Sequence, residues 1–174
     1  MELWDAYDIN RQLKGKELVR GVPLEKGDYH TVVHVCVFNS KNQMLIQQRQ
    51  PFKKGWSNLW DVTCGGSVLK GETSQQGAHR ELLEEVGLDY DFNGMRPNFT
   101  VNFYDGFDDF YLIEKDIDIN GLKLQYEEVR AVKWESMEKI FQMIDEGIFI
   151  PYFKSLIATA FETKGQHDGC IRTI

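Results

Sequence analysis

The alternation of apolar and polar positions divides the chain into short predicted strands and three predicted helices. Runs rich in β-branched and aromatic residues, bounded by turn residues, predict strands because such side chains pack well on a pleated surface. The predicted strands cover residues 3–8, 18–21, 30–38, 44–49, 60–64, 99–104, 107–114 and 129–134. The first two enclose a polar turn and therefore predict an N-terminal β-hairpin within residues 1–26.

Three segments carry the period of an amphipathic helix. Apolar residues recur three and four positions apart in segments 74–86, 136–146 and 152–163, which places them on one helical face. The first helix has clear end signals, since Thr73 can cap it, Gln76 completes a capping box and Gly87 supplies the stop. Helices follow the strands without strict alternation, so the predicted fold class is α/β (α+β), with a mixed sheet covered by helices.

Length, charge and cysteine usage narrow the class of protein. The 174 residues fit one domain, and the net charge of −7 without a Lys/Arg cluster argues against long nucleic acid as a partner. No apolar run reaches the roughly 18 residues of a membrane span. The N-terminus lacks a basic region followed by an apolar one, so we expect a cytoplasmic protein with no membrane partner. Cys36, Cys64 and Cys170 form no spaced framework and are expected to be reduced thiols.

The candidate chemistry is concentrated in residues 66–88, GSVLKGETSQQGAHRELLEEVGL. At about 100° per residue, Glu81, Glu84 and Glu85 share an arc of roughly 100° on the predicted helix. Like charges at this spacing repel each other, and a hard dication with oxygen ligands such as Mg²⁺ relieves the repulsion. Arg80 is spaced to pair with Glu84 one turn on. The alternative is a solvated acidic helix face.

Two further features of this segment bear on its geometry. The helix carries an apolar face that we expect to turn toward the core, formed by Ala78, Leu82, Leu83 and Val86. Glycines precede the helix, and we expect Gly65, Gly66 and Gly71 to form a loop in which the missing Cβ lets the backbone approach a metal or phosphate.

The segment resembles the Nudix box, G-x5-E-x7-R-E-U-x-E-E-x-G-U with U aliphatic. Every specified position matches: Gly66, Glu72, Arg80, Glu81, Leu82, Glu84, Glu85, Gly87 and Leu88. The resemblance implies a Nudix α/β/α sandwich over residues 27–163 and a Mg²⁺ site, with Mn²⁺ as a substitute ion. It also implies metal ligands from the three helical glutamates and from a backbone carbonyl at Gly65 or Gly66, with Glu72 as an orienting residue.

Residues outside the box are weaker candidates. The family resemblance implies that a glutamate ahead of a later strand, here Glu127 or Glu128, is an extra metal ligand or general base; a pair of surface glutamates is the alternative. Arg49, Lys53 and Lys54 are candidates for binding phosphates, and an ordinary solvated loop is the alternative. Three aromatic residues are candidates for stacking on a base, or else core residues: Trp56, Phe103 and Tyr104.

The resemblance extends to the subgroup related to isopentenyl-diphosphate isomerase and leaves three functions open. The isomerases have a catalytic Cys followed by Gly and a metal-binding His, whereas this chain has Cys64-Gly65-Gly66; His30 is a candidate for a second isomerase metal histidine. The intact glutamate set favours a hydrolase over an isomerase and over a non-catalytic nucleotide sensor.

The resemblance also implies a reaction. The expected substrate is a small molecule, a nucleoside diphosphate linked to another group or a similar organic diphosphate. Metal-bound water attacks phosphorus, and Glu81 is favoured as the general base ahead of Glu128. Members of the family often form dimers, so a homodimer stays open.

Overall fold

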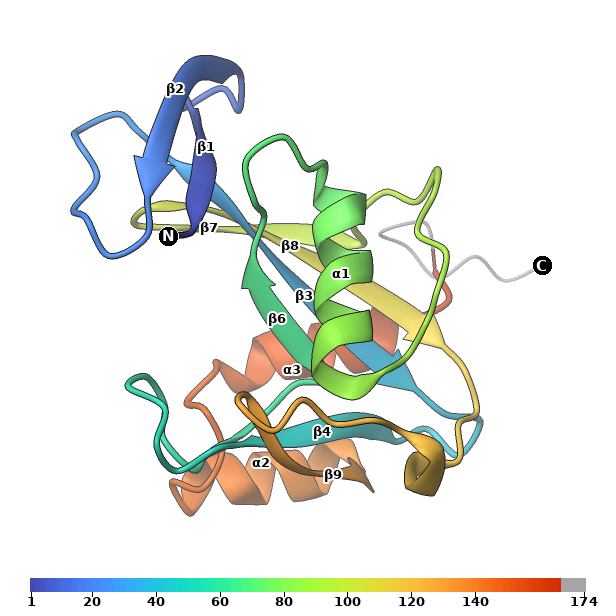
Figure 1. Cartoon of the computed structure of the whole chain (residues 1–174). Helices are drawn as coiled ribbons and strands as arrows, with labels where there is room; N and C mark the ends of the chain where they lie inside the picture. Colours follow the sequence, from blue (N-terminus) through green and yellow to red (C-terminus); the bar gives the residue numbers. More distant parts are fainter. Residues whose placement is uncertain (167–174) are drawn as a thin grey trace.

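The computed structural model describes residues 1–166 and has helices on both faces of a mixed sheet (Figure 1). The strands are β1 (Leu3–Tyr7), β2 (Leu13–Val19), β3 (His30–Phe38), β4 (Met44–Arg49), β5 (Trp60–Asp61), β6 (Cys64–Ser67), β7 (Phe99–Phe103), β8 (Gly106–Glu114) and β9 (Val129–Glu135). The helices are α1 (Ser74–Val86), α2 (Met137–Asp145) and α3 (Lys154–Thr163), with a short 3-10 turn at Ile119–Gly121.

Strand β3 is the centre of the sheet, and one of its edges is shared by two strands. On one side β3 runs parallel to β8 along its whole length, and β8 pairs antiparallel with β7. On the other side, residues 32–35 of β3 pair with β6, whereas Phe38 pairs with Met44 of β4. Strands β4, β5 and β9 therefore diverge from β6, and the sheet is forked at this point (Figure 1).

The two faces of β3 belong to two separate cores, as expected when successive side chains point to opposite faces. Val33, Val35 and Val37 pack with the buried face of α1. Cys36 and Phe38 pack on the opposite face with buried residues of α2 and α3 such as Ile140 and Ile157. This arrangement confirms the predicted α/β/α layering, with α1 on one side of the sheet and α2 and α3 on the other.

The N-terminal hairpin forms its own two-stranded sheet and is docked firmly on the end of β3. Leu3 pairs with Val19 and Trp4 with Leu18, and the Trp4 ring stacks on His30 with ring centroids 4.2 Å apart. Arg11, in the turn of the hairpin, forms two charge-assisted hydrogen bonds to the buried carboxylate of Asp109 on β8. The hairpin is thus fixed to the sheet by a partly buried ion pair and an aromatic stack.

Several sequence predictions about local structure were wrong in detail. Strand β2 begins at Leu13, because residues assigned to the polar turn pair with β1. The segment 60–64 contains two strands, β5 and β6, with different partners. Gly65 and Gly66 lie within β6 instead of a loop, because they pair with His34 and Val33 of β3. Helix α3 begins two residues later than predicted, at Lys154.

One predicted core residue of α1 faces solvent. Ala78, Leu82 and Val86 are buried as expected, but Leu83 is 44% exposed, because it lies on the far side of the helix from the sheet. Cys36 and Cys64 are buried free thiols, and Cys170 lies outside the described residues. In residues 1–166, no helix is both long and apolar enough to cross a membrane.

Candidate active site

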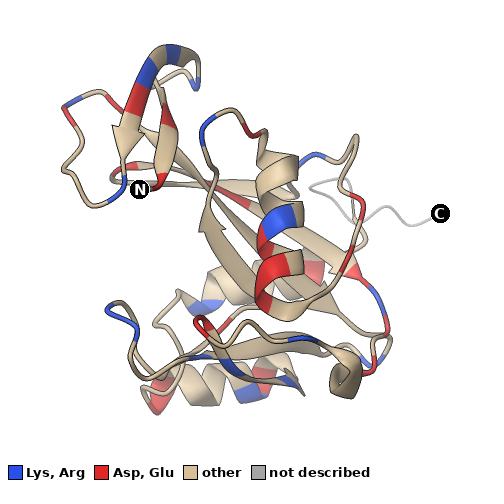
Figure 2. Cartoon of the chain, viewed as in Figure 1, with Lys and Arg blue, Asp and Glu red and all other residues tan. Residues whose placement is uncertain are grey.

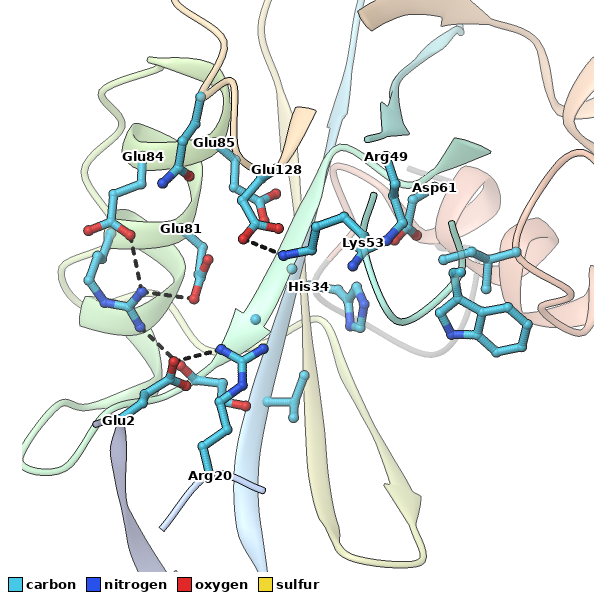
Figure 3. Close-up of a pocket in the computed structure, with 18 of the residues that line it drawn as sticks. Glu2, Arg20, His34, Arg49, Lys53, Asp61, Glu81, Glu84, Glu85 and Glu128 are labelled. Carbon is cyan, nitrogen blue, oxygen red and sulfur yellow. Dashed lines mark hydrogen bonds and ion pairs between the residues drawn. The ribbon is translucent and has the colours of Figure 1, made fainter. Parts of the chain in front are cut away.

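A cleft of about 730 Å³ opens where β6 and β4 diverge, beside the C-terminal half of α1. Figure 3 shows the carboxylates of α1 on one side, with Lys53, Arg49 and Asp61 opposite and Glu2 and Arg20 reaching in from the hairpin. Of the predicted site residues, the cleft lining includes Arg49, Lys53, Trp56, Gly65, Gly66, Arg80, Glu81, Glu84, Glu85 and Glu128. The fold therefore brings together nearly all of the candidates in one place.

Helix α1 is held in register by the end signals expected from the sequence. The Thr73 hydroxyl accepts a hydrogen bond from the backbone N–H of Gln76, and the Gln76 side chain accepts one from the backbone N–H of Thr73, which completes the capping box. Gly87 ends the helix in the left-handed conformation, with φ of 71°. These two ends fix which residues of α1 face the cleft.

Arg80 connects the glutamates of the helix with the loop before it. Its guanidinium donates to Glu72 at 2.8 and 3.0 Å, to Glu81 at 2.8 Å and to Glu84 at 3.4 Å. A further hydrogen bond reaches the backbone carbonyl of Ser67 on β6 at 3.0 Å. Burial acts to raise the pKa of Glu72, but hydrogen bonds from Arg80 and from the Leu69 N–H lower it overall. Arg80 thus orients Glu81 and Glu84 relative to β6.

The three helical carboxylates have different environments, although Figure 2 shows them as one acidic stretch of α1. The Glu84 side chain is half exposed. Burial raises the pKa of Glu81 against the opposing effect of Arg80. Glu85 is only 4% exposed, and burial followed by the nearby charge of Glu81 raises its pKa to about 8. Gln47 donates to Glu85 at 2.8 Å, so the most buried carboxylate has one neutral donor and no salt-bridge partner among residues 1–166.

This donor set fits a hard divalent cation. A Cβ at Gly66 would overlap the Glu81 carboxylate, so glycine at this position lets that carboxylate lie directly against the β6 backbone. Carboxylates whose pKa is raised by burial and by each other are stabilised in their ionised form by a bound cation. Within residues 1–166 no three His, Cys, Asp or Glu side chains are already gathered as a metal cluster. Arg80 contacts one carboxylate oxygen of Glu81 and one of Glu84, so each of these carboxylates keeps its other oxygen for a bound ion.

The loop between β4 and β5 forms the opposite, basic side of the cleft. Arg49 donates to the carbonyl of Gly55 at 3.2 Å and lies 3.9 Å from the Asp61 carboxylate. Trp56 lines the cleft and is 55% exposed, with φ of 51°. Lys54 is exposed and does not belong to the cleft lining. The end of β4 therefore presents Arg49 to the cleft, and the loop presents Lys53 and Trp56 but not Lys54.

The two candidate glutamates before β9 are separated by the fold. Glu128 lines the cleft and forms an ion pair with Lys53, with 2.6 Å between Nζ and Oε1. Its backbone carbonyl accepts from the N–H of Gln50 at 3.0 Å, and Gln125 in the same turn donates to the carbonyl of Glu85 at 3.0 Å. Glu127 is exposed and lies outside the lining. Of the two glutamates, Glu128 is therefore the one that can contact a molecule in the cleft.

Five titratable residues of the cleft were not among the candidates from the sequence. His34 hydrogen-bonds Asp108 through Nδ1 at 2.7 Å and contacts the Tyr152 hydroxyl at 3.3 Å through Nε2. Tyr152 donates to Asp61 at 2.8 Å. A polar residue inside the apolar run of β3 was the available signal for His34. Glu2 and Arg20 come from the hairpin, and nothing in their local sequence distinguishes them.

Other candidates lie away from the cleft. Cys64 is fully buried on the α1 side of the sheet, where burial raises its pKa well above the ordinary value. His30 is buried between Trp4 and Phe103, and burial lowers its pKa. Phe103 and Tyr104 are exposed to solvent outside the cleft lining. None of these four side chains is available to a molecule bound between α1 and Lys53.

The fold and the cleft together define an α/β/α protein in which one acidic helix faces a basic loop across a forked sheet. The family model described as the NUDIX domain matches residues 28–153, and the chain belongs to the Nudix hydrolase family. Members of the family hydrolyse pyrophosphate bonds and generally use a divalent metal ion.

Similar proteins agree with this assignment. An uncharacterised Nudix hydrolase of Listeria monocytogenes is 48% identical over 153 residues, which cover 88% of this chain and 90% of that protein. An isopentenyl-diphosphate Delta-isomerase of Pectobacterium atrosepticum is 40% identical over 78 residues, 45% of this chain and 42% of that one. A crystal structure of a Deinococcus radiodurans protein has a TM-score of 0.76 and 22% identity, covering 91% of this chain and 99% of that chain. The last similarity supports the fold.

Proposed function

We propose that the protein is a magnesium-dependent hydrolase of a diphosphate linkage in a nucleoside diphosphate bound to another group, or in a similar organic diphosphate. The observation that carries this proposal is the buried carboxylate of Glu85, with a pKa raised to about 8, beside Glu81 and opposite Lys53. Such a charge arrangement is costly unless a cation occupies it. Mn²⁺, which also accepts oxygen ligands, is expected to substitute for Mg²⁺.

The contacts of several charged residues in the cleft support this proposal. Glu81, Glu84 and Glu85, with a backbone carbonyl of Gly65 or Gly66, would hold the metal, and when bound it supplies charge neutralisation and a more acidic water. Arg80 keeps Glu81 and Glu84 oriented. Lys53 and Arg49 bind phosphate oxygens on the opposite side, since both are cations that line the cleft.

The proton of the attacking water passes to a carboxylate of the cleft. Glu81 is the first candidate, because burial raises its pKa toward that of an effective base. Glu128 is the second, because it lines the same cleft and is paired with Lys53 by a contact that a phosphate can replace.

The test is a screen of a library of nucleoside and organic diphosphates with Mg²⁺, in which phosphate or nucleotide products are measured. We expect turnover of at least one group of substrates, restored by Mg²⁺ or Mn²⁺ after chelation. Full turnover in excess chelator contradicts the metal assignment. No turnover of any diphosphate contradicts the proposed reaction and favours a nucleotide-sensing domain.

Isomerase activity is the second candidate, because the Pectobacterium isomerase is similar to nearly half of the chain. The position of Cys64 disfavours it. A thiol that acts on the carbon skeleton of a substrate must reach that substrate, whereas Cys64 is fully buried and absent from the cleft lining. The retention of Glu81, Glu84 and Glu85 further supports hydrolysis.

A further inference from the structure

The cleft extends beyond helix α1 to the N-terminal hairpin, which lies outside residues 28–153 matched by the family model. Glu2 and Arg20 stand opposite each other at the open end of the hairpin, where the N–H of Arg20 donates to the carbonyl of Glu2 at 3.1 Å. Their side chains form an ion pair at 2.6 Å, and both line the cleft. Figure 3 shows the Arg20 guanidinium directed toward the space beside Glu81.

The hairpin holds this pair at a fixed position relative to α1. The loop before α1 is bonded to β1, because the N–H of Lys70 donates to the carbonyl of Leu3 at 2.9 Å and the N–H of Gly71 donates to the Asp5 carboxylate at 2.7 Å. Lys70 also forms an ion pair with Glu17 on β2. Docking of the hairpin rests on these contacts and on the Arg11–Asp109 pair, so Arg20 is not required for it.

Arg20 differs from the other cations of the cleft in how its donors are used. Arg80 donates to three carboxylates and a carbonyl, and Lys53 is paired with Glu128. Arg20 uses one terminal nitrogen for Glu2, and its side chain is 62% exposed. Glu2 in turn accepts from the Trp4 indole at 2.9 Å. Arginine has five N–H donors, so Arg20 retains donors for a bound anion while Glu2 fixes its direction.

Cations therefore flank the carboxylates of α1 on two sides, with Arg20 on the hairpin side and Lys53 on the loop side. A diphosphate esterified at both ends places its charge at the centre only. We propose that Arg20 binds a terminal phosphate, so that the preferred substrates carry a further phosphate beyond the cleaved linkage. This inference rests on the proposed function, since it assumes that a diphosphate lies against α1.

The test compares ATP, which ends in a free phosphate, with ADP-ribose, whose diphosphate is esterified at both ends. In the wild type we expect a higher kcat/KM for ATP. Arg20→Gln should raise KM for ATP by about tenfold, equivalent to about 1.4 kcal/mol, with kcat nearly unchanged. KM for ADP-ribose should change less than about twofold, because that substrate has no group for Arg20 to bind.

Two further variants and one binding measurement make the test specific. Arg20→Lys should recover part of the lost affinity, and Arg96→Gln, which removes an exposed arginine outside the cleft, should behave as wild type. Calorimetry with inorganic triphosphate, with and without Mg²⁺, should show weaker binding only in Arg20→Gln, whether or not a nucleotide is hydrolysed. Unchanged thermal unfolding of Arg20→Gln is the folding control.

The outcomes separate this inference from the proposed function. A wild type that prefers ADP-ribose, or an Arg20→Gln variant that affects both substrates equally or neither, overturns the terminal-phosphate assignment and leaves diphosphate hydrolysis standing. If Arg20→Gln loses triphosphate binding and no diphosphate is hydrolysed by the wild type, the phosphate site at Arg20 is supported and the proposed hydrolase reaction is wrong.

Discussion

The two sides of the cleft carry opposite charge and are held in place by different means. The acidic side lies on α1, where helix geometry, a capping box and Arg80 fix Glu81, Glu84 and Glu85. The basic side lies on the end of β4 and the β4–β5 loop, where Arg49 and Lys53 form ion pairs with Asp61 and Glu128 from other segments. Regular structure is suited to holding an ion, while a loop with replaceable ion pairs is suited to exchanging a substrate.

Removing charge from the acidic side should have the largest effect. Glu85→Gln keeps the shape of the side chain and removes its charge, so we expect turnover to fall at least about a hundredfold, as for other groups that stabilise developing charge. Steady-state kinetics with Mg²⁺ provide the measurement, and Glu127→Gln, at an exposed site outside the cleft, is the control. A near-normal rate in Glu85→Gln would show that this carboxylate is not a ligand.

The acidic side should also give the metal-free protein an unusual pH dependence of stability. The pKa of Glu85 is about 8 in the folded protein, against 4.5 as its ordinary value. A raised folded pKa means that protonated Glu85 stabilises the fold below pH 4.5 and that this stabilisation is lost as pH rises toward 8. In chelator, Tm of the wild type should therefore fall over this interval more steeply than Tm of Glu85→Gln. Equal slopes in the two proteins would contradict the burial of this charge, and added Mg²⁺ should raise Tm of the wild type above pH 8.

Two adjacent lysines on the basic side provide a matched pair of variants, and the expected effect on KM is of intermediate size. Lys53 lines the cleft, whereas Lys54 is exposed outside it. Lys53→Gln should raise KM about tenfold, because it removes one charge-assisted hydrogen bond to a phosphate, while Lys54→Gln should leave KM within about twofold of wild type. If the two variants behave alike, the loop acts only through its overall charge.

The smallest effect is expected outside the cleft, at the buried residue Cys64. Cys64→Ala should leave hydrolysis within a few-fold, since loss of one buried thiol costs about 1 kcal/mol of packing and the thiol does not line the cleft. Incubation with isopentenyl diphosphate is the parallel assay. If the wild type forms the allylic isomer and the variant does not, the protein is an isomerase and the hydrolase proposal is wrong. Loss of a positioned proton donor would lower the isomerisation rate by about a hundredfold to ten-thousandfold.

Local sequence was sufficient to predict helix α1 and the shared face of its three cleft glutamates. A capping residue, a terminal glycine and a repeat of apolar positions act within a few residues of one another, so Thr73, Gln76 and Gly87 could be assigned without a fold. The same periodicity placed Glu81, Glu84 and Glu85 on one face. It did not distinguish their environments, because the burial of Glu85 and the exposure of Glu84 depend on β6 and on the segment around Gln125.

Long-range pairing decided what the local pattern left open. Gly65 and Gly66 have the composition of a loop, but pairing with β3 makes them a strand, since backbone hydrogen bonding with a partner outweighs weak local preference. The cleft lies at the fork between β6 and β4, and its lining includes Lys53 but not Lys54, and Glu128 but not Glu127. Arg20 lines the cleft because the hairpin is held by residues distant in sequence, such as Asp109, 98 residues from Arg11, and the loop before α1. The sequence by itself determined the acidic helix and its chemistry, whereas the tertiary structure decided which distant residues face it, because those contacts depend on segments that local patterns do not connect.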